Sequence, residues 1–166
     1  MYNHYYCSKK RKLMTNNQST VHNPVGRFMV AVGAVIELEG TGKILLNKRS
    51  HKLDWQPNEW EIMYGRIDQH EGPIGGLKRE IKEETGLEDI EIHEILSVWH
   101  IYRGQEQTAE NELIGITYHV TTKQEEITIS GEHDDYGWFD PKEAVEMVKI
   151  EGIKRDVLNY IRKVKK

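Results

Sequence analysis

The chain has 166 residues, of which 37% are hydrophobic and 30% are charged, and its formal net charge is -4. This length suits one domain that buries roughly two-thirds of the surface of its unfolded chain. The charge gives no general reason to expect a nucleic acid partner, no apolar run is long enough to span a bilayer, and the single cysteine, Cys7, excludes an intramolecular disulfide. Because the polar N-terminus resembles no secretory signal, the expected compartment is the cytoplasm.

The first 24 residues (MYNHYYCSKKRKLMTNNQSTVHNP) are polar and show no sustained periodicity. We therefore expect a flexible tail over residues 1–24 and a folded domain over residues 25–166. A short basic run at residues 9–12 is better explained by solvation than by contact with an anionic surface. Met14 is a second candidate for the natural start.

The folded part opens with strand-like segments. Residues 28–38 (FMVAVGAVIEL) are too continuously apolar for an edge strand and predict a buried one. A turn over residues 39–42 leads into a returning strand over residues 43–49. A loop then runs through Pro57, and the alternating residues 60–64 predict a short strand.

Residues 65–87 (GRIDQHEGPIGGLKREIKEETGL) are the most informative stretch. We predict a loop over Gly65–Gly72 and a helix over Pro73–Thr85. Proline suits the first turn of a helix, and Gly86 suits the left-handed position just past its end.

The predicted helix carries an acidic cluster that does not stabilise it. Glu80, Glu83 and Glu84 project from one side, where like charges repel by roughly a few tenths of a kcal/mol per pair. The adjacent Gly75 and Gly76 each cost roughly 1 kcal/mol relative to alanine. A hard divalent cation would relieve the repulsion, because Mg²⁺ takes oxygen ligands and keeps water and substrate phosphates in its shell. The alternative without a function is a solvated acidic helix face.

Further strands and two helices are expected beyond Leu87. The strand-like segments are residues 90–102, 112–122, 126–130 and 136–139. Asp140 and Glu143 form a capping-box pattern for a helix that runs to about Lys149. A C-terminal amphipathic helix is predicted by the spacing of Ile153, Val157, Ile161 and Val164.

The stretch over residues 65–87 resembles the Nudix box without a gap, although it covers only 23 of the 166 residues. The defining positions are filled by Gly65, Glu71, Arg79, Glu80, Ile81, Glu83, Glu84, Gly86 and Leu87. The resemblance implies an α/β fold, namely the Nudix α/β/α sandwich with a mixed β-sheet. It also implies a metal-dependent hydrolase of phosphoric anhydrides.

Two positions depart from the family pattern. Met63-Tyr64-Gly65 stands where a Pro-Gly-Gly or Gly-Gly entry is expected, and His70 stands where many relatives have glycine. Both changes narrow the freedom of the loop backbone.

The resemblance also implies how a metal is held. Glu80, Glu83 and Glu84 would bind Mg²⁺ or Mn²⁺, and the backbone carbonyl of Tyr64 would add a ligand. Divalent ions suit this reaction because they neutralise phosphate oxygens and make water a better nucleophile.

Supporting and catalytic roles follow in the same way. Arg79 and Glu71 would orient the metal ligands through hydrogen bonds. Glu80 and Glu132, the latter in a loop before the last strand, compete for the role of general base. For Glu132, a solvated loop acid is an equal alternative. His133 is expected to be an exposed surface residue without a catalytic role.

Residues outside the box are candidates for substrate binding. Arg49 and Lys52 are candidates for phosphate contacts, and Trp55 and Tyr102 are candidates for stacking on a base. No proline lies between Pro73 and Pro141, which argues against ADP-ribose because a downstream proline marks that branch of the family. We favour a nucleoside diphosphate linked to another moiety, followed by a nucleoside triphosphate. No membrane partner is expected, and a homodimer is compatible with this interpretation.

Two other functions were weighed against hydrolysis. Residues 49–60 (RSHKLDWQPNEW) resemble the corresponding region of isopentenyl-diphosphate isomerases, but those enzymes use a cysteine in the folded domain and Cys7 lies in the tail. A non-catalytic nucleotide-sensing module would be marked by a degenerate box, whereas this box is intact.

Overall fold

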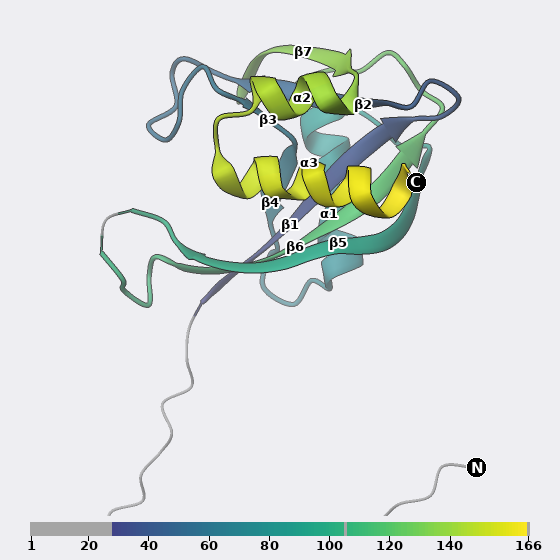
Figure 1. The fold of residues 1–166 in the computed structure, drawn as a ribbon. Coiled ribbons are helices and arrows are strands. Elements are labelled where there is room, and N and C mark those ends of the chain that lie inside the picture. The colour runs from purple at the N-terminus through teal and green to yellow at the C-terminus, as the bar shows by residue number, and fades with distance from the viewer. Residues whose placement is uncertain (1–27, 105, 166) are drawn as a thin grey trace, which may run out of the picture.

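The computed structural model describes residues 28–104 and 106–165, whose arrangement is shown in Figure 1. The predicted tail over residues 1–24, with Cys7, the basic run and Met14, lies outside the described residues. In the described ranges, none of the helices is long and apolar enough to cross a membrane.

In the described part of the chain, four strands precede the first helix, three strands follow it, and two helices come last. The strands are β1 (Met29–Leu38), β2 (Lys43–Arg49), β3 (Trp60–Glu61), β4 (Met63–Arg66), β5 (Ile90–Tyr102), β6 (Glu112–Thr122) and β7 (His133–Phe139). The helices are α1 (Pro73–Thr85), α2 (Pro141–Met147) and α3 (Glu151–Val164).

All seven strands form one mixed sheet around β1. The order is β3-β2-β1-β6-β5, while β4 pairs with β1 and β7 pairs with β2. The β1–β6 pair is parallel, from Met29 opposite Leu113 to Leu38 opposite Thr122, and the other pairs are antiparallel. The continuously apolar β1 thus lies inside the sheet, as its composition predicts.

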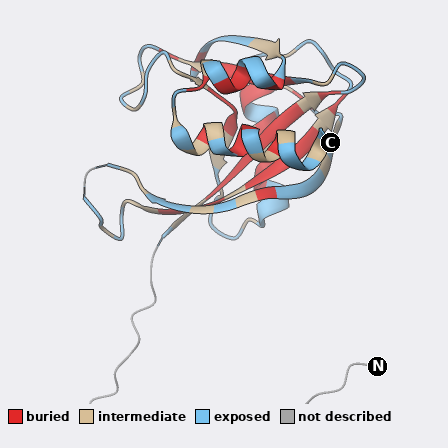
Figure 2. Cartoon of the chain, viewed as in Figure 1, coloured by how far each residue is buried: buried red, intermediate tan, exposed pale blue. Residues whose placement is uncertain are grey.

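Helices cover both faces of this sheet, which confirms the predicted α/β/α sandwich. Figure 1 shows α1 behind the sheet and α2 and α3 in front of it. Alternate β1 side chains enter two cores, because successive residues of a strand point to opposite faces. Val32, Ala34 and Ile36 pack on the α1 side, whereas Val35 packs with α2 and α3. Figure 2 shows these buried strands between helices whose outer faces are exposed.

The helix of the acidic stretch has the predicted bounds. It spans Pro73–Thr85, and Gly86 follows in the left-handed conformation with φ 70°. The backbone N–H of Gly86 donates to the carbonyl of Lys82, which satisfies one of the last carbonyls of the helix. A glycine is suited to this position because a Cβ would be strained there.

Several boundaries differ from the sequence prediction. Residues 60–64 are not one strand, because the chain is interrupted at Ile62 and its two parts pair with different neighbours, β3 with β2 and β4 with β1. Strand β4 continues through Gly65 to Arg66, so the predicted loop begins later. Helix α2 ends at Met147 rather than near Lys149, because Val148 is extended and buried in the core.

The predicted strand over residues 126–130 is wrong. The backbone N–H of Thr128 donates to the carbonyl of Thr85 at 2.9 Å, and that of Ser130 donates to the carbonyl of Glu84 at 3.1 Å. The segment therefore satisfies the end of α1 instead of pairing with a strand. This docking brings the following turn, which contains Glu132, toward α1.

Candidate active site

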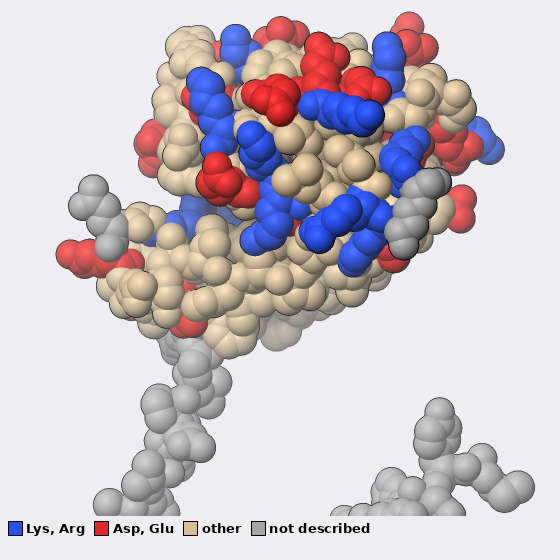
Figure 3. Space-filling view, viewed as in Figure 1, with Lys and Arg blue, Asp and Glu red and all other residues tan. Residues whose placement is uncertain are grey.

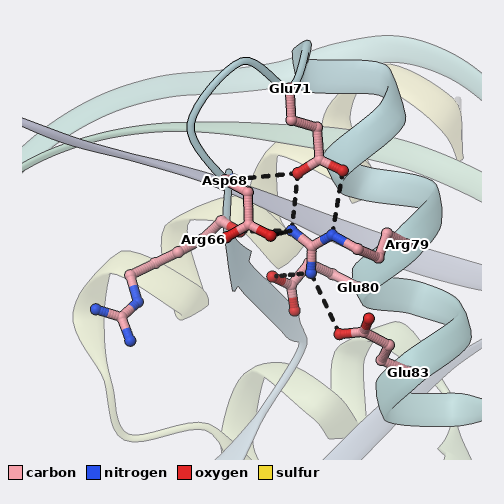
Figure 4. Close-up of polar contacts among 6 residues, drawn as sticks. All are labelled: Arg66, Asp68, Glu71, Arg79, Glu80 and Glu83. Atoms are coloured by element: carbon pink, nitrogen blue, oxygen red, sulfur yellow. Dashed lines mark hydrogen bonds and ion pairs between the residues drawn. The ribbon is translucent and has the colours of Figure 1, made fainter.

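Arg79 on α1 holds the loop between β4 and α1 in place, as Figure 4 shows. Its Nε and Nη2 donate to the two carboxylate oxygens of Glu71 at 3.1 and 2.8 Å, and Nη2 also donates to the carbonyl of Arg66 at 3.0 Å. Glu71 in turn accepts the backbone N–H of Asp68 at 3.1 Å. The hydrogen bonds from Arg79 lower the pKa of Glu71 below its ordinary value. Arg79 and Glu71 are therefore paired, while their role in orienting metal ligands stays a prediction.

The same guanidinium also reaches the acidic cluster. Nη1 of Arg79 donates to Glu80 at 2.9 Å and to Glu83 at 3.2 Å. Gly65 permits this packing, because a Cβ at that position would lie 2.1 Å from Cδ of Glu80. The first glycine of the stretch is therefore required by the close approach of a carboxylate to the backbone of β4.

Glu84 is the most deeply buried carboxylate of the cluster, with 8% of the residue exposed. Burial raises its pKa well above the ordinary value, and the charges of Glu61, Glu80 and Glu132 raise it further. Burial also raises the pKa of Glu80, although Arg79 opposes this shift. The carboxylates of Glu61, Glu80, Glu84 and Glu132 therefore form a region of excess negative charge.

Glu61 on β3 belongs to this cluster but is absent from the residues predicted from sequence. Its Oε1 accepts from Nη1 of Arg49 at 2.8 Å and lies 3.2 Å from Nε2 of His133. The prediction that His133 is a surface residue is wrong, since it is 6% exposed and lies on β7. The available signal was an acidic residue inside an apolar strand, since carboxylates are rarely buried without partners.

A cavity of about 980 Å³ opens beside the carboxylates. Glu61, Glu80, Glu84 and Glu132 line one part of it. Another part is lined by side chains from β5, β6 and α3, and from the loop between β2 and β3; these include Trp99, Ile101, Leu113, Arg155 and Trp55. Figure 3 shows the surface hollowed between the projecting β5–β6 hairpin and the rest of the molecule. A mostly apolar cavity with a few charged groups is the usual form of a ligand site.

Two arginines that line the cavity contact the ring of Trp55. The guanidinium of Arg49 is 5.0 Å from the centre of the Trp55 ring, and that of Arg103 is 5.9 Å from it. Nε of Arg49 also donates to the carbonyl of Trp55 at 3.0 Å, which fixes the loop. Both distances lie within the usual range of cation–π contacts.

The predicted substrate residues divide into two groups. Arg49 and Trp55 line the cavity, as does the proposed base Glu132. Lys52 is exposed and is not part of the lining. Tyr102 also lies outside the lining, because it alternates along the chain with Ile101 and Arg103, which do face the cavity, and its ring contacts that of His100 at 5.1 Å.

The four predicted metal-binding residues are placed differently. Glu80, Glu84 and Tyr64 line the cavity, whereas the side chain of Glu83 is 60% exposed and contacts Arg79. Among the residues of the described ranges, no three acidic, histidine or cysteine side chains converge as a finished metal site. Arg79 pairs with Glu80 and Glu83, and burial together with neighbouring acids raises the pKa of the Glu84 carboxyl. Carboxylate oxygens of this kind are the donors that a hard divalent cation prefers.

The backbone conformation of His70 shows why a glycine suits this position in many relatives. His70 adopts φ 70°, the left-handed conformation that favours glycine. A histidine there is strained by its Cβ, and its side chain lines the cavity.

Comparison with known proteins agrees with this geometry. The model of the NUDIX domain matches residues 27–161. The chain belongs to the NUDIX domain family. This NUDIX chain is 27% identical over 133 residues to an RNA pyrophosphohydrolase of Bartonella clarridgeiae, a match that covers 64% of this chain and 73% of that protein.

The chain is also similar to a second curated protein and to a solved structure. The chain is 28% identical over 102 residues to an octanoyltransferase of Myxococcus xanthus, with 59% of this chain covered but only 27% of that protein. The NUDIX chain thus spans about a quarter of that relative. The structure of the Escherichia coli dihydroneopterin triphosphate pyrophosphohydrolase is similar with a TM-score of 0.69 and 16% identity, covering 83% of this chain and 99% of that one. This last likeness concerns the fold.

Proposed function

We propose that this NUDIX chain is a metal-dependent hydrolase that cleaves the phosphoric anhydride bond of a nucleoside diphosphate linked to another moiety. A nucleoside triphosphate is the second substrate class. The observation that carries the proposal is the buried carboxylate cluster at one end of a cavity large enough for a nucleotide. The pyrophosphohydrolase names of two similar proteins agree with it.

Glu80 and Glu84 are the residues that would hold Mg²⁺ or Mn²⁺, with Glu83 from the same helix and the carbonyl of Tyr64. Their oxygen donors suit a hard cation, and Glu84 gains most because its charge is buried among other acids. When bound, the metal supplies positive charge against the phosphate oxygens and makes water a better nucleophile.

The remaining chemistry falls to side chains of the chain itself. Glu132 is the proposed general base; it lines the cavity, and its charge raises the pKa of both Glu80 and Glu84, which supports a place beside the carboxylates. The base takes a proton from water as the water oxygen bonds to phosphorus and the bridging P–O bond breaks. Glu80 remains the alternative base, although its hydrogen bond to Arg79 favours an orienting or ligand role.

The part of the cavity that is lined by tryptophans would bind the nucleoside or its partner moiety. Trp99 and Trp55 offer aromatic faces, and stacking on such faces is largely independent of base identity. Arg103 lines the same region and can contact an anionic group of the substrate. Aromatic rings beside an arginine favour a substrate with a planar base attached to phosphate over a substrate with an apolar group attached to diphosphate.

The test is a screen of nucleoside triphosphates, dinucleoside polyphosphates, nucleotide sugars and 5′-triphosphate RNA, each with Mg²⁺ or Mn²⁺. We expect release of a nucleoside monophosphate or of phosphate from one of these classes. Glu84→Gln should lose at least ~100-fold in rate, because it removes a proposed ligand and loss of a residue that merely supports a ligand already costs about 10- to 100-fold. Glu88→Gln is the matched control, because Glu88 is exposed just beyond α1 and contacts only Lys82 among the ion pairs of the described chain. Full activity in Glu84→Gln would remove the metal assignment.

A further inference from the structure

Asp156 of α3 is a buried carboxylate at which four parts of the fold meet. It is 0% exposed, and its Oδ2 accepts from the hydroxyls of Tyr64 at 2.7 Å and Thr117 at 2.6 Å. Its Oδ1 accepts from the hydroxyl of Ser97 at 2.7 Å and from Nε of Arg155 at 2.9 Å. One side chain thereby connects α3 with β4, β5 and β6.

The first connection leads to the carboxylate end of the cavity. Tyr64 directly precedes Gly65, against which the Glu80 side chain packs. The Tyr64 ring fills the space left by Gly33, where a Cβ would lie 2.3 Å from the ring. The hydroxyl at the far end of this ring is held by Asp156. The orientation of Tyr64 therefore sets the course of β4 where it passes the carboxylates.

The second connection leads to the wall of the cavity. The Thr117 hydroxyl donates to Asp156 and accepts from Nε1 of Trp99 at 3.0 Å. The Trp99 ring crosses over Gly115, where a Cβ would lie 2.0 Å from the ring, and meets the Tyr64 ring edge-on at 5.8 Å. The indole that lines the cavity is thus fixed by the same carboxylate.

We propose that Asp156 is a positioning residue that fixes two parts of the cavity lining, through Tyr64 beside the carboxylates and through Thr117 and Trp99 at the wall. A buried charge is a weak source of stability, since the cost of removing it from water is large even when it is well paired. Four donors in fixed directions instead give it the power to orient the groups that it binds. The substrate part of this inference rests on the proposed function, whereas the metal part requires only a cation at the carboxylates.

The design compares three variants that each delete one hydrogen bond to Asp156. Tyr64→Phe cuts the connection to the carboxylate end, and Thr117→Val cuts the connection to Trp99. Ser97→Ala is the matched control, because Ser97 donates to the same carboxylate but, within the described residues, neither lines the cavity nor accepts a side-chain hydrogen bond from a residue that does, whereas Thr117 accepts one from Trp99. All three should lower the thermal unfolding midpoint, since each removes a hydrogen bond to a charged group.

The first readout is the rise in the unfolding midpoint of the full chain on titration with MnCl₂ alone. Tyr64→Phe should need about 10-fold more Mn²⁺ for half of the effect, as expected when a supporting hydrogen bond of a metal site is lost. Ser97→Ala should keep the wild-type concentration. Equal behaviour of these two variants would overturn the positioning role and leave it as a structural tie.

The second readout is steady-state hydrolysis of the substrate found by the screen. Thr117→Val should raise KM by about 10-fold and leave kcat and the Mn²⁺ midpoint near their wild-type values, because it loosens the binding wall alone. Equal KM values in Thr117→Val and Ser97→Ala would overturn this branch. If no substrate is hydrolysed but the Mn²⁺ difference holds, the positioning role stands and the proposed reaction fails. If Mn²⁺ does not stabilise the wild type, both are wrong.

Discussion

The guanidinium of Arg79 binds both carboxylate oxygens of Glu71, at 3.1 and 2.8 Å, and so joins α1 to the loop that precedes it. In the sequence Glu71 precedes Pro73 and Arg79 follows it, so their contact closes the loop between β4 and α1. A planar guanidinium with several donors can make this paired contact and still reach Glu80. A lysine has one ammonium group and cannot make both contacts in the same geometry.

Arg79→Lys should therefore lower kcat/KM by roughly 10- to 100-fold while the protein stays folded. The measurement is steady-state hydrolysis, with circular dichroism as the test of folding. Lys78→Arg is the matched control, because Lys78 is an exposed neighbour on the same helix. An Arg79→Lys enzyme with wild-type kinetics would show that a single positive charge is enough.

Glu84→Gln should melt at a higher temperature than the wild type when both are free of metal. The substitution removes a charge that is buried among other acids, whose repulsion raises the pKa of Glu84. A shift of about 2–4 °C is expected for roughly 1 kcal/mol in a chain of this size. The same variant should gain little stability from MnCl₂, so the order of the two melting points should reverse in its presence. A lower melting point for metal-free Glu84→Gln would contradict the electrostatic account.

Glu84 should also give the metal-free wild type a distinctive pH dependence. Its folded-state pKa is raised, so the folded protein holds this proton more tightly than the unfolded chain does. Its contribution to the free energy of unfolding is complete below the unfolded pKa of about 4.3 and is lost as pH rises through the folded pKa. Urea unfolding at several pH values should show a steeper loss toward neutral pH in the wild type than in Glu84→Gln. Parallel curves would refute this prediction.

Gly115→Ala should destabilise the protein and weaken substrate binding together. The added Cβ would lie 2.0 Å from the Trp99 ring, so the indole must leave its place over β6. Overpacking of this kind costs about 1–3 kcal/mol. Gly131→Ala is the control for thermal stability, because a Cβ there would meet no atom within 4 Å. An unchanged melting temperature in Gly115→Ala would show that the Trp99 ring can move to another position without loss of stability.

His70→Gly should stabilise the loop before α1. The histidine adopts φ 70°, and relief of its left-handed strain is worth about 1 kcal/mol, less the entropy that glycine adds to the unfolded chain. Thermal unfolding measures the net effect. His93→Gly is the comparison, because His93 lies in β5 and does not have a positive φ, so glycine should destabilise there. Destabilisation by both changes to a similar degree would mean that the His70 side chain contributes more than its strain costs.

Local pattern was enough to predict most elements of this fold. The helix over Pro73–Thr85 and the strand over Lys43–Arg49 have the bounds that their sequence signals indicate. These signals act over a few residues: proline opens a helix, glycine closes one, and apolar spacing selects the buried face. The prediction of a strand over residues 126–130 was wrong because backbone N–H groups of this segment donate to carbonyls at the end of α1, which is distant in sequence.

What the sequence alone determined is the acidic stretch itself, with Arg79, Glu71 and the helical carboxylates at fixed spacing. What only the tertiary structure decided is which other residues join them. Register across β2 sets Glu61 opposite Asn47 and His133 opposite Arg49, so β3 brings a buried acid to the guanidinium of Arg49 and β7 brings a buried histidine to that same acid. The physical reason is that pairing of strands and docking of a turn depend on the whole sheet, whereas helical spacing is carried by the chain within a single turn.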